Sequence, residues 1–369
     1  MDTLHLTTAH GSTDTRIFDK EAKSLAEAGF DVGIVAHDTP EEPRDGVEFY
    51  SLGTVTSRIE RWQSIRNVAK IATEVDASVY HFHDPELLPV GVYLSYATDG
   101  AVVYDVHENF GHVALMREWI PNWASQVLST GLPLAERTAA RRFDAVVSVS
   151  DWIGDPFQGV AGTVQTIHNF PLTTSMPSIE ETIETTADCT LCFVGGLENA
   201  RGMHEMLDLL RQLVEDGVDA ELWALGSWQP DTNREAVEQF IKAHDLCNRV
   251  TFPGYLDYDE MFRYLESADV GLALYDVEHC KFAIPTKFFE YLYAGLPVVT
   301  TPVSAVSKFL PPEYRYVVPE GDTEGAAIAV RRALDTTHDK TAMRQIVEEQ
   351  YSWEQEAKKL IDLYDELLD

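Results

Sequence analysis

Short apolar runs alternate with longer amphipathic segments along the whole chain. In the first half, seven runs rich in Val, Ile and aromatic residues predict strands. Segments with apolar residues at helical spacing separate several of them and predict helices at 15–29 and 58–75. The predicted strands of this half are residues 3–9, 31–37, 47–52, 78–83, 101–107, 144–150 and 164–169.

The same alternation restarts in the second half, after a segment of different character. Residues 173–187 are rich in Thr, Ser and Glu with little periodicity, which predicts a linker between domains. Beyond it, strands are predicted at 190–195, 221–226, 249–252, 270–275, 297–300 and 315–318. Helices are predicted at 203–215, 233–243, 258–266 and 324–334.

The last segment predicts one more helix with a single apolar face. Its apolar residues, at helical spacing, are Leu360, Ile361, Tyr364, Leu367 and Leu368. The predicted domains are therefore 1–172, with 352–369 added to it, and 188–351.

Strands separated by helices predict an α/β protein with two parallel, doubly wound sheets. No Gly-x-Gly-x-x-Gly fingerprint follows the first strand, so a dinucleotide redox cofactor is not indicated. A length of 369 residues suits two domains.

The charge balance is unusual, with 28 basic against 61 acidic residues and a net charge of −33. The acidic residues are spread along the chain, which is typical of proteins from salt-loving organisms such as halophilic archaea, where salt screens their repulsion. The alternative is a protein that binds cationic partners. Either way, binding to nucleic acid is disfavoured because phosphates are repelled.

The sequence shows no signal peptide and no apolar run long enough to span a membrane, so we expect a cytoplasmic protein. Of the four cysteines, Cys189 and Cys192 form a single Cys-x-x-Cys inside a predicted strand. With no second pair, buried core thiols are favoured over a zinc or redox site.

The stretch 284–301 combines a loop, a short helix and a buried strand. Pro285 suits the start of the helix, and Gly295 suits its end. Lys287 then lies in the first turn, with Glu290 one turn later on the same face. A cation there opposes the helix macrodipole, and a bound phosphate would reconcile the two. We therefore expect Lys287 to bind a diphosphate and Glu290 a ribose; the alternative is an ion pair on a solvated helix face.

The pattern Pro-x-Lys-x-x-Glu-Tyr-x-x-x-Gly-x-Pro-Val-Val in this stretch resembles the donor-site signature of the retaining GT-B glycosyltransferases of family 4. The resemblance implies two Rossmann-like domains facing a cleft, with the C-terminal helix crossing back to the first domain. It implies the same roles for Lys287 and Glu290. Many relatives carry a second Glu eight residues earlier, and here that position is Phe282.

Polar clusters follow several predicted strands, where doubly wound folds bind ligands. His81 and His83 share a face, with Asp84 just beyond them, which allows either a metal site or the capping of a following helix. The segment resembles the His-Asp-Pro-Glu motif of one branch of family 4, whose members are generally metal-independent. We therefore expect no metal and no other cofactor, and we place His83 and Asp84 on the acceptor side.

Two further segments of the first half resemble the same branch. The Tyr-Asp-x-His-Glu run implies that His107 contacts a hydroxyl of the transferred sugar and that Glu108 meets the acceptor; the alternative is a satisfied histidine at a strand end. In the first loop, Gly11 would let the backbone approach the diphosphate or the acceptor. Asp14 is alternatively a plain helix cap, with Arg16 packing beside it.

In the second half, a strand, a glycine pair and a cation before a helix suit phosphate binding. Relatives often carry an Arg where Gly196 stands here, so one cation is missing, while Arg201 takes the later basic position. The Phe-Pro-Gly-Tyr-Leu segment resembles a loop that contacts the nucleobase. There Gly254 would allow close approach, and Tyr255 or Leu256 would supply backbone groups.

The resemblance implies a retaining glycosyltransferase that uses a UDP- or GDP-sugar donor. Its acceptor would be a glycan, a lipid-linked glycan at the cytoplasmic membrane face, or a small molecule. The expected catalytic residues are His107, Arg201 and Lys287. The alternatives are a GT-B sugar-nucleotide epimerase, a metal-dependent hydrolase built on His81, His83 and Asp84, and a non-catalytic nucleotide-sugar binding protein.

Overall fold

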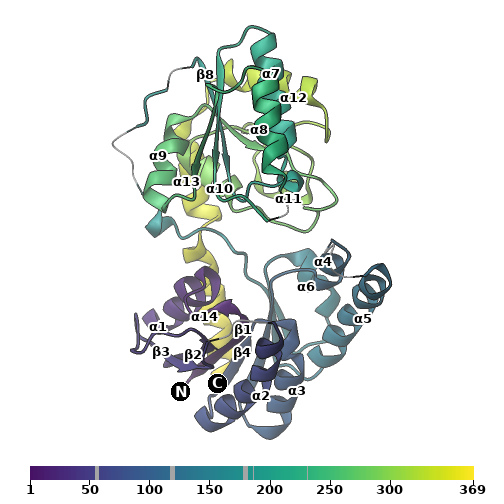
Figure 1. The fold of residues 1–369 in the computed structure, drawn as a ribbon. Helices are drawn as coiled ribbons and strands as arrows, with labels where there is room; N and C mark the ends of the chain where they lie inside the picture. Colours follow the sequence, from purple (N-terminus) through teal and green to yellow (C-terminus); the bar gives the residue numbers. More distant parts are fainter. Residues whose placement is uncertain (55–57, 117–120, 178–181, 186, 231) are drawn as a thin grey trace. The chain divides into compact units, whose positions relative to one another are not determined.

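The computed structural model describes the chain except residues 55–57, 117–120, 178–181, 186 and 231. It divides into two compact units (Figure 1). Unit 1 is Met1–Asn169 with Trp353–Asp369, and unit 2 is Phe170–Ser352. The predicted linker, 173–187, lies in unit 2, and part of it falls outside the described residues.

Unit 1 is built on a seven-stranded parallel sheet with the order β3-β2-β1-β4-β5-β6-β7. Chain order reverses direction between the adjacent strands β1 and β4, so ligands are expected beyond their carboxyl ends. The strands are β1 (Thr3–Gly11), β2 (Val32–His37), β3 (Val47–Ser51), β4 (Val79–Phe82), β5 (Ala101–Val106), β6 (Ala145–Ser148) and β7 (Thr163–Thr166).

Helices connect these strands, and some of them were not predicted. The predicted helix at 15–29 begins as the π-helical segment η1 (Thr15–Ala22) and continues as α1 (Lys23–Glu27); α2 (Arg58–Val75) matches its prediction. The sequence analysis missed α3 (Leu88–Ala97), α4 (Phe110–Met116), α5 (Asn122–Ala140) and α6 (Asp151–Gly154). Two short 3₁₀ turns are η2 (Pro85–Leu87) and η3 (Asp155–Phe157).

Unit 2 repeats the plan with a six-stranded parallel sheet in the order β10-β9-β8-β11-β12-β13, and its reversal lies between β8 and β11. Its strands are β8 (Cys189–Val194), β9 (Ala220–Leu225), β10 (Val250–Gly254), β11 (Val270–Ala273), β12 (Val298–Thr300) and β13 (Arg315–Val317). Its helices are η4 (Thr173–Ser175), η5 (Asn199–Arg201), α7 (Met203–Glu215), α8 (Arg234–Ala243), α9 (Tyr258–Ser267), α10 (Lys287–Ala294), α11 (Ser304–Phe309), α12 (Thr323–Leu334) and α13 (Lys340–Gln350).

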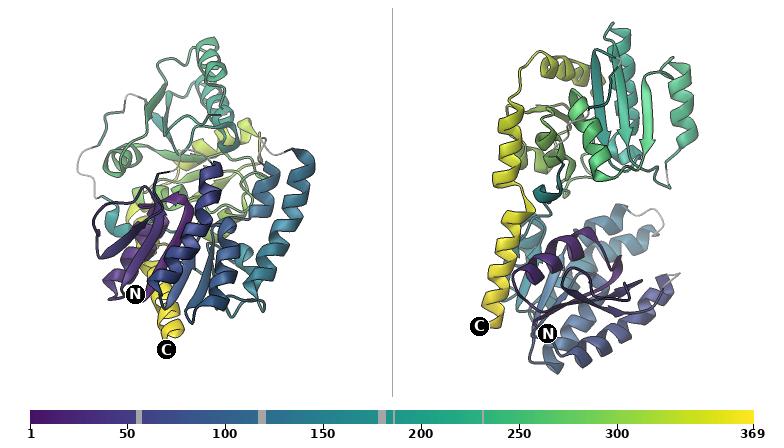
Figure 2. Two further views of the ribbon diagram at one scale, coloured as in Figure 1. Left: turned by 60° about the horizontal axis from the view of Figure 1, so that its bottom comes forward. Right: turned by 90° about the vertical axis from the view of Figure 1, so that its left-hand side faces the viewer.

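The last helix, α14 (Trp353–Leu368), leaves unit 2 and packs on unit 1, as expected (Figure 2). The Tyr364 hydroxyl lies 2.8 Å from Nδ1 of His81 and accepts a hydrogen bond from Thr3, and Trp353 Nε1 donates to Ser24. The two chain termini consequently lie close together (Figures 1 and 2).

Each unit has its own apolar core, formed by its sheet and covering helices. Cys189 and Cys192 are buried in unit 2 as free thiols, as the sequence predicts. Among the described residues, no helix is both long and apolar enough to cross a membrane.

Candidate functional site

Lys287 is the first residue of α10, and its ammonium group is buried. The Nζ atom lies 3.7 Å from the ring centroid of Phe193 and 5.2 Å from that of Tyr275. Within the described part of the chain, Nζ has no hydrogen-bond partner. The alternative of an ion pair on a solvated helix face is wrong, because Lys287 and Glu290 are 5% and 8% exposed.

Arg201, the last residue of η5, lies beside Lys287. A Cβ atom built on Gly195 would lie 3.0 Å from Lys287 Nζ and 3.4 Å from Arg201 Nη1, so both cations converge on this glycine. Gly195 has a φ of +137°, a backbone conformation that residues with a side chain rarely adopt. The structure therefore brings together the two cations that the sequence analysis selected, which we call the cation pair.

The electrostatics of the cation pair favour an anion. Burial, and then repulsion from Arg201, hold the pKa of Lys287 well below its ordinary value. Arg201 is about half exposed and bonds to the carboxylate of Glu198, which leaves Lys287 without a carboxylate at bonding distance in the described chain. A diphosphate at Gly195 would supply the missing charge and the missing hydrogen-bond acceptors.

Glu290 lies one turn after Lys287, and Tyr258 donates a hydrogen bond of 3.3 Å to it. Burial and the neighbouring charge of Glu290 raise the pKa of the Tyr258 hydroxyl, which therefore stays a donor at neutral pH. This contact orients the carboxylate that was expected to bind a ribose. Tyr258 is a supporting residue that the sequence analysis did not name.

The remaining donor candidates of unit 2 lie near the same edge of its sheet. Gly254 ends β10 with a φ of +88°, and Tyr255 after it is 84% exposed. Leu256 is partly exposed in the same loop. Gly196 faces Gln229, whose Nε2 would lie 2.8 Å from a Cβ there. Gly11 ends β1 and belongs to unit 1.

In unit 1, Asp105 is the centre of a buried network that includes His107. Arg16 donates to both carboxylate oxygens, at 3.0 and 3.1 Å, while His107 Nε2 lies 2.6 Å and His83 Nδ1 3.2 Å from Oδ2. Burial alone would raise the pKa of Asp105, but the charge of Arg16 and the bond to His107 hold it well below its ordinary value. His107 is thus a histidine held by a carboxylate, and it is partly exposed.

Two residues expected on the acceptor side have internal partners instead of open faces. His83 is fully buried. Asp84 is 1% exposed, and its Oδ2 accepts hydrogen bonds from the backbone N–H groups of Thr8 and Ala9 and from the Thr7 hydroxyl. Asp84 therefore fixes the carboxyl-terminal part of β1. Glu108, by contrast, is exposed.

These positions also bear on the metal-dependent hydrolase alternative. His81 and His83 are fully buried, and Asp84 is committed to backbone groups. A hydrolytic metal needs an open coordination position for water or substrate. The three residues do not form such an open centre.

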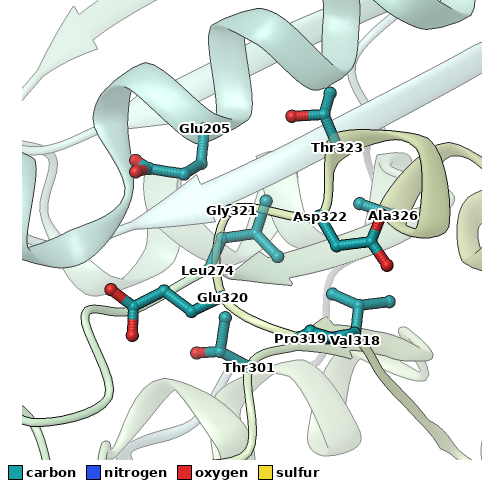
Figure 3. Close-up of a pocket in the computed structure, with 10 residues that line it drawn as sticks. All are labelled: Glu205, Leu274, Thr301, Val318, Pro319, Glu320, Gly321, Asp322, Thr323 and Ala326. Carbon is teal, nitrogen blue, oxygen red and sulfur yellow. The ribbon is translucent and has the colours of Figure 1, made fainter.

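Figure 3 shows a different pocket of unit 2, a small and partly open one with room for about 10 Å³, between α7, α12 and the ends of β11 to β13. Its polar lining includes the carboxylates of Glu205, Glu320 and Asp322, and no basic residue lines it. A diphosphate would be repelled there, so the cation pair is the better candidate for an anion.

The central roles of Arg16 and Asp105 were not predicted, and Gly195 faces the cation pair, whereas the predicted Gly196 faces Gln229. Arg16 was expected to pack beside Asp14. Asp14 does cap the helix, accepting from the backbone N–H of Arg16, but the Arg16 side chain turns inward to Asp105. An arginine next to a capping aspartate gives no sequence signal of a partner 89 positions away.

Comparisons with known proteins agree with this architecture. The family described as "Glycosyl transferase 4-like domain" matches residues 16–169, and the family described as "Glycosyl transferases group 1" matches residues 188–336. The two matches fall in unit 1 and unit 2 respectively. No curated protein matches this chain.

Solved structures with the same fold cover nearly all of the chain at low sequence identity. Sucrose-phosphate synthase from Thermosynechococcus elongatus is 17% identical with a TM-score of 0.76, covering 100% of this chain and 99% of its own. Alr3699/HepE from Anabaena in complex with UDP is 15% identical with a TM-score of 0.72, covering 99% and 100%. A glycosyltransferase from Rickettsia africae ESF-5 is 14% identical with a TM-score of 0.76, covering 100% and 98%.

Proposed function

We propose that the chain is a glycosyltransferase, as the family matches to its two units support, and that it transfers a sugar from a nucleotide-sugar donor with retention at the anomeric carbon. The observation that carries this proposal is Lys287: a buried ammonium group without a hydrogen-bond partner in the described chain, beside Arg201 and against a glycine. Such a group fits the diphosphate of a donor.

The donor is assigned to unit 2. The cation pair takes the diphosphate, Glu290 the ribose, and the loop of Gly254, Tyr255 and Leu256 the base. Alr3699/HepE is described in complexes with UDP and with UDP-glucose, which supports a UDP-sugar, and a GDP-sugar is the second candidate.

In the transfer step, the bond between the anomeric carbon and the diphosphate oxygen breaks while an acceptor hydroxyl attacks from the same face. The hydroxyl proton passes to the departing phosphate oxygen. The cation pair stabilises the charge that develops on the leaving group, which is the main electrostatic task and needs no metal in the step. His107, held by Asp105, contacts a hydroxyl of the sugar. The anomeric configuration of the product, read by NMR, tests retention.

The acceptor is assigned to unit 1. There Glu108 is exposed, and so are Gly11 at the end of β1 and Thr13 after it. Helix α5 presents large apolar side chains to solvent: Trp123 is 74%, Val127 64% and Leu134 66% exposed. Exposed apolar faces of this size suit an apolar partner. They support a lipid-linked glycan as the acceptor. The protein would then be cytoplasmic and would bind this acceptor at the membrane surface.

The proposal is tested by titrating UDP-glucose and a GDP-sugar calorimetrically in molar KCl. Lys287→Ala should weaken binding of the preferred donor about 30-fold or more, since losing one partner of a buried charge pair costs about 2 kcal/mol or more. Lys281→Ala is the control, because Lys281 is exposed and pairs with Glu278. Equal donor affinity in Lys287→Ala and the native chain would refute the site.

Donor binding without transfer to any acceptor would favour the non-catalytic alternative. Isomerisation of the donor sugar in the absence of acceptor would favour the epimerase.

A further inference from the structure

Three histidines and a glutamate meet in the interior of unit 1, next to Asp105, which contacts one of them, His83. His5 on β1 and His81 on β4 are register partners in adjacent parallel strands, and His83 lies two positions beyond His81 on the same face. Glu21 of η1 covers this face. All four side chains are 0% exposed, and one ligand atom from each lies within 4.8 Å of the others.

We propose that His5, Glu21, His81 and His83 bind a divalent transition metal, Zn²⁺ by preference, as a closed structural site. Three imidazoles and one carboxylate are ligands that zinc accepts, and four protein ligands without an open position are typical of structural zinc. The proposal does not depend on the donor site of unit 2. It revises the expectation of a metal-free protein and leaves the transfer step metal-independent.

The spacing of the ligand atoms suits a tetrahedral ion. His5 Nδ1 and His83 Nε2 are 3.0 Å apart, and each lies 3.9 Å from Oε2 of Glu21. Ligand atoms about 2.0–2.1 Å from a tetrahedral zinc lie about 3.3–3.4 Å from one another. The three observed separations bracket that value, and His81 completes a set whose four ligand atoms all lie within 4.8 Å of one another.

The groups around the cluster orient its histidines as second-shell partners do in metal sites. His83 Nδ1 faces Asp105 at 3.2 Å, which directs Nε2 into the cluster. His81 Nδ1 lies 2.8 Å from the Tyr364 hydroxyl, which leaves Nε2 for a metal. When both Nδ1 atoms carry the proton, both Nε2 atoms present lone pairs.

Hydrogen bonding alone leaves this interior unsatisfied. In the described chain, Nε2 of His81 and Oε2 of Glu21 are buried without a hydrogen-bond partner. Oε1 of Glu21 has an ion-pair contact with Arg16 Nε at 3.0 Å, so Oε2 is the oxygen turned towards the histidines. Buried polar atoms without partners are costly, and a bound ion would satisfy them.

The charge balance also admits a cation. Glu21 and Asp105 carry two negative charges when ionised, and Arg16 supplies a single permanent positive charge to both. A dication would lower the free energy of the ionised carboxylate.

The test is metal analysis of the whole chain, produced in zinc-supplemented medium and purified without immobilised-metal chromatography. After desalting, we expect elemental mass spectrometry to find about one zinc ion per chain. The variants Glu21→Gln and His81→Gln should each lower that content at least about tenfold. His37→Gln is the matched control and should keep the metal, because His37 is also buried in unit 1 but bonds to Ser64 and the Gly53 carbonyl.

Cobalt distinguishes the buried site from the acidic surface. Co²⁺ in place of zinc should give the intense visible absorption of a tetrahedral ion, whereas surface carboxylates give the weak spectrum of an octahedral one. If a variant does not fold, the native chain decides: removal of metal by chelator should lower its melting temperature, and added Zn²⁺ should restore it. A folded native chain that takes up neither ion in tetrahedral form, or that keeps its metal in both variants, would overturn the proposal.

Discussion

Lys287 has opposite effects on stability and on binding. Its ammonium group lies under the ring of Phe193 without a hydrogen-bond partner in the described chain, and Arg201 stands beside it. Burying a cation in this way destabilises the empty protein, since water is lost and not replaced. The arrangement is favourable only when a diphosphate occupies the site.

Replacing Lys287 by Met should therefore stabilise the unliganded chain at pH 7 by about 1–2 kcal/mol while weakening donor binding about 30-fold or more. The low pKa of Lys287 in the folded state means that the unfolded chain binds more protons, so the native chain gains stability as pH rises towards the ordinary lysine value, about 10.4. The advantage of the variant should shrink over that rise. Denaturant titrations at several pH values measure it.

The control for this prediction is Lys281→Met, which removes an exposed lysine of the same unit and should change stability little at any pH. A Lys287→Met chain that is less stable than the native chain at pH 7 would mean that the ammonium group has a partner of its own.

Asp105 holds the His107 ring in place through its carboxylate. Asp105→Asn should lower the free energy of unfolding at pH 7 by about 3–5 kcal/mol, because it leaves Arg16 buried without its full charge partner. The depressed pKa of Asp105 contributes stability above about pH 4 that is lost as pH falls towards the folded value, so the two chains should converge in acid.

Kinetic measurements on the same variant distinguish a role of Asp105 in positioning His107 from a role in stability alone. We expect kcat to fall in both Asp105→Asn and His107→Gln, with the affinity for UDP unchanged, because UDP lacks the sugar that His107 contacts and its diphosphate, ribose and base are assigned to unit 2. Full activity in a folded Asp105→Asn chain would remove His107 and its carboxylate from the mechanism.

Among the elements, α14 shows how a helix from the end of the chain completes the first unit. Its Tyr364 is fully buried, with its hydroxyl bonded to Thr3 and His81. In the same helix, the carboxylate of Glu356 accepts a hydrogen bond from the backbone N–H of His168. Unit 1 therefore needs the last residues of the chain for its interior.

Replacing Tyr364 by Phe keeps the ring and removes the hydroxyl. We expect a loss of about 1–3 kcal/mol in the free energy of unfolding, because His81 then has a buried ring nitrogen without a partner. Thermal or denaturant unfolding followed by circular dichroism measures it. Tyr96→Phe, at an exposed tyrosine of α3, is the control and should be nearly neutral. Equal stability of Tyr364→Phe and the native chain would show that the contact contributes nothing.

The helices α3 and α5 were not predicted because each lacks a clear local helix signal. Helix α3 is apolar almost all round, so it has no amphipathic stripe to reveal a helical period. Helix α5 contains Gly131 and Pro133, which are typical breakers. In both cases packing against other elements of unit 1 overrides the local signal.

For the molecule as a whole, the net charge of −33 is the dominant property. Carboxylates repel one another over the entire surface, and salt screens that repulsion. We expect the melting temperature to rise by roughly 10 °C between low salt and molar KCl, as a halophilic protein would show. Differential scanning calorimetry over a KCl series tests this.

The control is the melting temperature in a neutral osmolyte of the same osmolality as the KCl solution. Only the salt screens charge, so a rise in KCl alone is due to screening and not to exclusion of the solute from the protein surface. A melting temperature that is flat in KCl would instead favour a protein whose acidic surface is balanced by cationic partners.

The sequence by itself determined the two parallel, doubly wound sheets and the first turn of α10 with Lys287 and Glu290. These features are local: β-branched runs, amphipathic periods and helix-end residues act within a few positions. Motif spacing also selected Arg201, which lies near Lys287 as expected.

Only the tertiary structure decided which side chains share a site. Arg16 and Asp105 are 89 positions apart, and His5 and His83 are 78 apart, so their contacts arise from strand order and not from spacing. Tertiary structure also decided that Gly195 faces the cation pair, because a backbone turn after β8 sets its direction. Such choices depend on long-range packing, which leaves no periodic trace in a single sequence.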